Sequence, residues 1–114
     1  MTDQVQIQIP RPKVKEGSAF TATAYFRDRA TSAASVPTSI KYRVDCLTTG
    51  ITLTDWTTVT AAASASIAVT ATNNAIRSAA NVTERKQLTV AANYGLETQS
   101  TESVAWEVEN NLAY

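Results

Sequence analysis

The pattern of apolar and polar positions in residues 16–28 predicts a half-buried β-strand. After Gly17, every second residue from Phe20 to Phe26 is apolar, and the residues between them are threonine or tyrosine. Successive side chains of a strand point to opposite faces, so this alternation gives one face to the core and the other to solvent. Gly17 can supply the turn that leads into the strand.

Further segments alternate in the same way, at the spacing of a small β-sandwich. Pro10 and Pro12 end the first of them and place it at a sheet edge, because proline has no amide hydrogen to donate to a strand ladder. Gly50 and the threonines before it form the turn after the third strand. The expected strands cover residues 4–9, 20–26, 39–46, 51–59, 65–71, 85–93 and 101–109.

Residues 61–71 have a helical alternative, because they are rich in alanine, the best helix former. The period of two in Ile67, Val69 and Ala71 favours a strand instead. Beyond this strand, Asn73 and the asparagine after it can start a single helical turn, with Ile76 as its apolar plug.

The inward positions of these strands predict one hydrophobic core. Cys46 shares the inward phase of Tyr42 and Val44, so we expect it to act as a buried small hydrophobe. It is the only cysteine, which excludes an intrachain disulfide. The predicted core contains Val5, Ile7, Phe20, Phe26, Ile40, Tyr42, Val44, Trp56, Ile67, Val69, Leu88, Val90, Trp106 and Val108.

Composition bounds the function of the chain. Its 114 residues suit one domain, and its formal net charge of zero gives no long-range field for nucleic acid or an anionic membrane. Without histidine, Ser-His-Asp, Cys-His and the usual zinc sites cannot be assembled. Glu107 and Glu109 are the nearest approach to paired carboxylates, but on one strand face they favour a solvated edge. We therefore expect a non-enzymatic protein without a metal or cofactor.

No targeting signal stands out in the sequence. The chain has no charged start followed by an apolar stretch, and no segment approaches the roughly 20 apolar residues of a membrane span. We expect neither a secretory signal nor a membrane anchor.

Charge is distributed unevenly along the chain. Residues 1–45 hold seven Lys and Arg against four Asp and Glu, a net charge of +3, and residues 46–114 hold three against six, a net charge of −3. If the strands at 39–46, 85–93 and 101–109 share a sheet, a basic row of Lys41 and Arg43 and an acidic row of Glu107 and Glu109 lie on its outer face. Such a face suits contact with a second copy, although ordinary interspersion of surface charge is the alternative.

Residues 46–76 carry one charge, Asp55, among many threonines, alanines and serines. Monomeric proteins usually protect β-edges with charges, so either hydroxyl groups keep this surface wet or a neighbour covers part of it. Trp56 favours the neighbour. Tyr94, at the tip expected near Gly95, is the one aromatic residue in the loops at 29–38 and 93–100 that could contact a glycan.

Five stretches of the sequence resemble immunoglobulin-like or fibronectin type III-like domains encoded in tailed bacteriophage genomes. The resemblance covers nearly the whole chain and departs from antibody domains, which have a cysteine pair. It implies an all-β fold, a single immunoglobulin-like (fibronectin III-like) antiparallel β-sandwich without a disulfide over residues 1–114. The stretches are KEGSAFTATAYFRD, PTSIKYRVDCLTTG, LTDWTTVTAAASASIAVTATNNAI, ERKQLTVAANYGL and SVAWEVEN.

Two functional hypotheses follow. The resemblance implies a non-enzymatic accessory protein of a phage virion, made in the host cytoplasm and attached to the particle surface. It would be a capsid decoration or head fibre, or a small tail or neck component, with other virion proteins as partners and possible self-association. The alternative is a recognition module for a glycan or protein on the host-cell surface. Neither hypothesis involves nucleic acid, a membrane or a cofactor. The candidate interaction residues are Lys41, Arg43, Trp56, Tyr94, Glu107 and Glu109.

Overall fold

Eight β-strands make up the regular structure of the chain in a computed structural model that describes residues 4–27, 31, 33–78, 80–93 and 99–110. No helix occurs within these ranges. The strands are β1 (Gln4–Gln8), β2 (Lys13–Lys15), β3 (Phe20–Arg27), β4 (Ser39–Cys46), β5 (Ile51–Val59), β6 (Ser64–Val69), β7 (Thr83–Asn93) and β8 (Gln99–Glu109).

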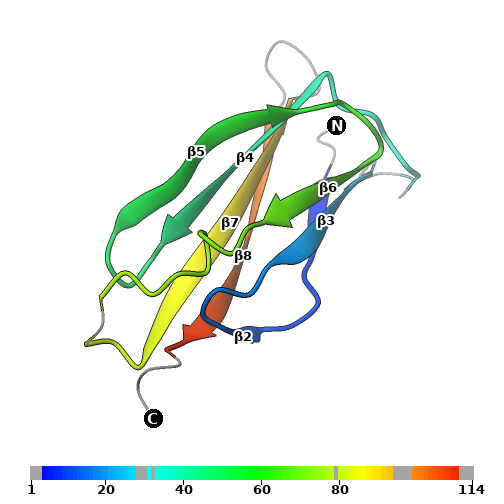
Figure 1. Cartoon of the computed structure of the whole chain (residues 1–114). Coiled ribbons are helices and arrows are strands. Elements are labelled where there is room, and N and C mark those ends of the chain that lie inside the picture. The colour runs from blue at the N-terminus through cyan, green and yellow to red at the C-terminus, as the bar shows by residue number, and fades with distance from the viewer. Residues whose placement is uncertain (1–3, 28–30, 32, 79, 94–98, 111–114) are drawn as a thin grey trace.

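The strands form two sheets that pack face to face (Figure 1). The smaller sheet has the order β1-β3-β6, and the larger has the order β2-β8-β7-β4-β5. The molecule is elongated, with extents of 49 × 23 × 20 Å. This architecture is an immunoglobulin-like β-sandwich, so the predicted fold class is confirmed. The segment at 64–69 is a strand, which decides against the helical alternative.

One strand was not predicted from the sequence. After β1, the proline-containing segment 10–12 moves the chain from the smaller to the larger sheet, where β2 pairs with β8 in parallel. All other strand pairings are antiparallel. The three residues of β2 are too few for a clear alternation, which explains why the pattern did not reveal it.

The core lies between the two sheets, at the predicted inward positions. Phe26, Ile40, Leu88 and Trp106 are all at most 1% exposed, and Phe20 packs against the core from a half-buried position. Alanines fill much of the inner face of β3 and contribute to the inner faces of β6 and β7. They are Ala22, Ala24, Ala65 and Ala92.

Trp56 does not belong to this core, so its assignment there is wrong. Its side chain is 40% exposed, whereas Leu53 and Val59 of the same strand pack against the core. Trp56 lies three residues from each of them, and an odd separation along a strand puts side chains on opposite faces. Irregularities in the β4–β5 register, between Tyr42 and Asp45, interrupt the regular alternation further.

The segment after β6 forms hydrogen-bonded turns rather than a helix. The amide of Asn74 donates to Thr70 O and Ala71 O, both at 3.2 Å. The Asn73 side chain accepts the Thr70 amide at 3.1 Å. Ile76 is half-buried against the core, in the position predicted for an apolar plug.

Candidate functional site

On the outer face of the β4–β5 hairpin, the cationic groups of two β4 side chains lie over the aromatic ring of Trp56. Lys41 Nζ lies 4.8 Å from the centroid of the Trp56 ring, and Arg43 Cζ lies 5.7 Å from it. Lys41 and Arg43 share the outer face of β4 because they are two residues apart. We call Lys41, Arg43 and Trp56 the β4–β5 platform.

Polar contacts hold Arg43 in place. Its Nη2 donates to Asp45 Oδ1 and to Thr52 Oγ1, both at 2.8 Å, and its Nε lies 3.0 Å from Asp45 Oδ2. The hydroxyl of Thr52 donates to Asp45 Oδ1 at 2.9 Å, which closes the network across the two strands. The hydrogen bond to Asp45 raises the pKa of Arg43, although burial acts in the opposite direction. Arg43 is therefore occupied within the chain.

Lys41 is the available cation of the platform. Within the described part of the chain, its ammonium group makes a cation–π contact with Trp56 and no hydrogen bond or ion pair. The hairpin also carries Leu47 and Ile51, which are 45% and 42% exposed. Ile51 is two residues from Leu53 and therefore shares its phase rather than that of Trp56. The platform itself combines one exposed indole with one available positive charge, a composition that suits contact with a protein.

The acidic row lies elsewhere on the same sheet. Strands β4, β7 and β8 are neighbours, as the two-row hypothesis requires, but Arg43 is level with Thr89, whereas Glu107 is level with Arg85. The two rows are therefore offset along the strands. They share the outer face, but they do not lie directly across β7 from each other.

Glu107 and Glu109 both form ion pairs with a lysine of the neighbouring strand. Lys13 Nζ of β2 lies 3.8 Å from a carboxylate oxygen of each. These exposed ion pairs each contribute about 0–1 kcal/mol, but they reduce the negative charge that this edge presents. Tyr94, the remaining candidate, lies outside the described residues.

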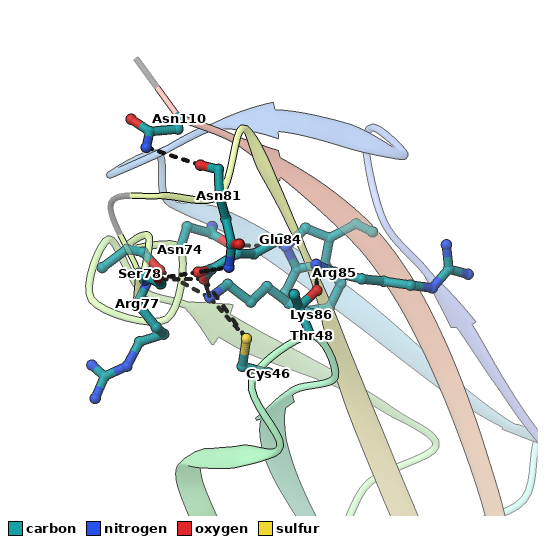
Figure 2. A network of polar contacts seen from close by, with 12 residues as sticks. Cys46, Thr48, Asn74, Arg77, Ser78, Asn81, Glu84, Arg85, Lys86 and Asn110 are labelled. Atoms are coloured by element: carbon teal, nitrogen blue, oxygen red, sulfur yellow. Dashed lines mark hydrogen bonds and ion pairs between the residues drawn. The ribbon is translucent and has the colours of Figure 1, made fainter. Parts of the chain in front are cut away.

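A buried polar cluster at one end of the sandwich escaped the sequence reasoning (Figure 2). The side chains of Glu84 and Lys86 are 0% exposed and form an ion pair of 2.9 Å. Cys46 is buried as predicted, but its Sγ lies 3.5 Å from Lys86 Nζ and 3.7 Å from Glu84 Oε1 rather than among apolar groups alone. The signal was present: the inward phase of Leu88 and Val90, extended back along β7, reaches both charged residues.

The carboxylate of Glu84 organises the connection between β6 and β7. It accepts the amides of Arg77 and Ser78 at 2.8 and 2.9 Å, and the side-chain amide of Asn81 at 2.9 Å. Burial raises the pKa of Glu84, but these donors together with Lys86 lower it more, to about 2. Because every group is paired within the chain, the cluster has a structural role.

The described residues offer no group of three metal-ligating side chains. Nor do they form any helix long and apolar enough to cross a membrane.

Comparison with known proteins supports the fold. No protein-family profile and no curated protein matches the sequence. Among solved structures, the chain is similar to the adhesin InvE of Yersinia pseudotuberculosis, with a TM-score of 0.55 and 11% identity over 92% of this chain and 32% of the adhesin. It is also similar to a conjugative transposon lipoprotein of Bacteroides eggerthii, with a TM-score of 0.50 and 13% identity over 91% of this chain and 95% of the lipoprotein. The chain thus spans about a third of the adhesin, and at these identities the likeness concerns the fold alone.

Proposed function

We propose that this protein is a non-enzymatic accessory protein of a bacteriophage virion that attaches to another virion protein through the β4–β5 platform. The observation that carries the proposal is Trp56, a large aromatic residue held on the surface at 40% exposure by Lys41 and Arg43. Tryptophan and arginine are enriched among the residues that dominate binding energy at protein interfaces.

The composition of the hairpin supports the same proposal. Among the described residues, three of the five exposed large hydrophobic side chains, those of Leu47, Ile51 and Trp56, lie on the hairpin and within the segment 46–76, whose one charge is Asp55. Repeated attachment to a particle lattice can make a weak single contact effectively permanent, so the free protein need not oligomerise. The resemblance of the sequence to phage-encoded immunoglobulin-like domains points to a virion as that lattice.

A particle-binding assay tests this function. Labelled protein is mixed with phage particles that lack it, and the bound copies are counted and located by electron microscopy. We expect stoichiometric decoration of capsid, tail or neck that is lost with Trp56→Ala and weakened with Lys41→Glu. Val82→Ala is the matched control, because Val82 is 56% exposed and lies outside the hairpin. Decoration that survives Trp56→Ala would move the contact away from the platform, and absence of decoration would reject the virion role.

The second candidate is a recognition module for the host-cell surface. Two observations favour it: the structural likeness to an adhesin, and the solvent-exposed indole of Trp56, which can stack on a sugar. Binding of the labelled protein to host cells or purified surface glycans, without binding to particles, would select this candidate.

A further inference from the structure

A groove opens at the edge of the larger sheet opposite to β5. Its volume is about 520 Å³, within the range of about 300–1,000 Å³ that is common for ligand sites. One wall is the segment from Pro10 to Lys15, which includes the edge strand β2. The other wall is formed by Ser18, Ala19 and Phe20, where β3 begins.

Apolar side chains contribute to the lining of this groove. Val14 and Phe20 are half-buried and pack against the core of the sandwich. The Phe20 ring meets the Trp106 ring edge to face, with centroids 5.2 Å apart and an interplanar angle of 83°. Contact with the core fixes the Phe20 ring, so an apolar group entering the groove meets a rigid surface.

The charges of the groove are unbalanced. It is lined by Arg11, Lys13 and Lys15 and by one carboxylate, that of Glu109. Lys13 is already close to Glu109 and Glu107, at 3.8 Å from each. Within the described residues, Arg11 and Lys15 have neither an ion pair nor a side-chain hydrogen bond. Two cations therefore remain available for an anionic ligand.

Buried hydrogen bonds hold the turn between the two walls. Asn74, which is fully buried, accepts the Gly17 amide at 3.0 Å with its backbone oxygen and donates from Nδ2 to Ser18 O at 2.6 Å. Its Oδ1 accepts the indole N–H of Trp106 at 2.8 Å. Ser18 N donates to Lys15 O at 3.1 Å, and Gly17 takes the left-handed φ of 76° that this turn needs. The groove is therefore preorganised, which lowers the entropy cost of binding.

We infer that this groove binds a short acidic peptide segment of a neighbouring protein, with an apolar side chain of the segment against Phe20 and Val14 and its carboxylates on Arg11 and Lys15. Charge complementarity requires the acidic groups, and the apolar lining distinguishes the peptide from an anionic polysaccharide, which has no side chain to place there. Because β2 and β5 are the two edges of the larger sheet, this site is separate from the β4–β5 platform and does not depend on it.

Fluorescence anisotropy with defined peptides tests the inference. The probe is fluorescein-labelled Glu-Glu-Leu-Glu-Glu with an amidated C-terminus, measured at about 50 mM salt so that screening is weak. We expect binding to weaken by about tenfold or more when glutamine replaces the four glutamates, and to weaken clearly when serine replaces the leucine. The double variant with Arg11→Glu and Lys15→Glu should no longer bind the labelled peptide.

Two further variants separate the groove from general charge effects. Arg77→Glu with Arg85→Glu changes the net charge by the same amount at two exposed positions outside both the groove and the platform, and should retain binding. Ala19→Trp fills the groove without removing a charge and should abolish binding, with an unchanged circular dichroism spectrum as the check on folding. Binding that survives Ala19→Trp, or that is equally strong for dextran sulfate and for the serine peptide, would overturn the inference. Failure of the wild-type protein to bind the probe would also overturn it, whatever the particle assay shows.

Discussion

The buried carboxylate of Glu84 needs hydrogen-bond donors from the protein to replace the water that it loses on folding. Four nitrogen donors of the chain replace that water, with the Cys46 thiol as a longer, weaker contact. The four are the amides of Arg77 and Ser78, the Asn81 side chain and the Lys86 ammonium group. Lys86 in turn donates to Ala75 O at 2.9 Å. Removing the charge of Glu84 would leave buried donors without an acceptor, which is costly in a protein interior.

Acid should therefore weaken the fold through Glu84. The folded-state pKa of about 2 is below the ordinary value of 4.5, so the unfolded chain binds the proton more readily. The stabilisation is complete above about pH 4.5 and is lost as the pH falls toward 2; its full size is on the order of 3 kcal/mol.

Urea denaturation of Glu84→Gln and wild type at several pH values measures this contribution. We expect the variant to be about 3–5 kcal/mol less stable at pH 7 and the difference to shrink as the pH approaches 2. Glu102→Gln, at an exposed position, is the control and should stay within about 0.5 kcal/mol of wild type. A stability difference that does not change with pH would contradict the assignment.

The two tryptophans should respond very differently to truncation. Trp106 is 1% exposed and Trp56 is 40% exposed. Trp106→Ala should cost about 3–5 kcal/mol of unfolding free energy because it opens a cavity in the core, whereas Trp56→Ala should cost about 1 kcal/mol or less. Chemical denaturation of both variants measures this. Equal losses would show that the Trp56 ring is packed more tightly than its exposure indicates.

At the scale of elements, Asn74 joins three parts of the chain that are far apart in sequence. Its hydrogen bonds connect the turn after β6 to Ser18, in the turn before β3, and to Trp106 on β8. Asn74→Ala would leave the buried indole N–H and the Ser18 carbonyl without these partners.

We expect Asn74→Ala to destabilise the protein by roughly 2–4 kcal/mol, since each unsatisfied buried polar group costs about 1–3 kcal/mol. Asn73→Ala is the matched control and should cost less, because both of its side-chain bonds, to Thr54 Oγ1 and Thr70 N, are only partly buried, whereas the bond of Asn74 to the Trp106 indole is buried. Thermal unfolding followed by tryptophan fluorescence compares the two. An equal loss for both would mean that the link to Trp106 is not the important contact.

At the scale of the molecule, stability depends on packing between two sheets. The single cysteine excludes an intrachain disulfide, and the described residues hold no cluster of metal ligands. We expect a far-ultraviolet circular dichroism spectrum typical of β-sheet, and a melting temperature that neither a chelator nor a reductant changes by more than about 1 °C. A large drop with either reagent would reveal a stabilising bond or ion that this architecture does not require.

Much of this architecture follows from local patterns in the sequence. Alternation alone located β3, β4 and β7 to within a few residues, because a sheet with one face on the core requires a period of two. The same alternation placed Lys41 and Arg43 together on an outer face. The mutual adjacency of β4, β7 and β8 followed only from the resemblance to fibronectin-like domains.

The sequence by itself therefore determined seven of the eight strands, most of the inward positions and the absence of an intrachain disulfide. Tertiary structure decided the rest. The strand register offset Glu107 from Arg43, and the pairing of β4 with β5 brought the cations of β4 over the Trp56 ring. The connection after β6 supplied donors that let Glu84 be buried. The physical reason is the distance along the chain between the residues that interact. Alternation acts between residues two apart, whereas register, charge compensation and the groove beside β2 depend on segments that only the folded sheets bring together.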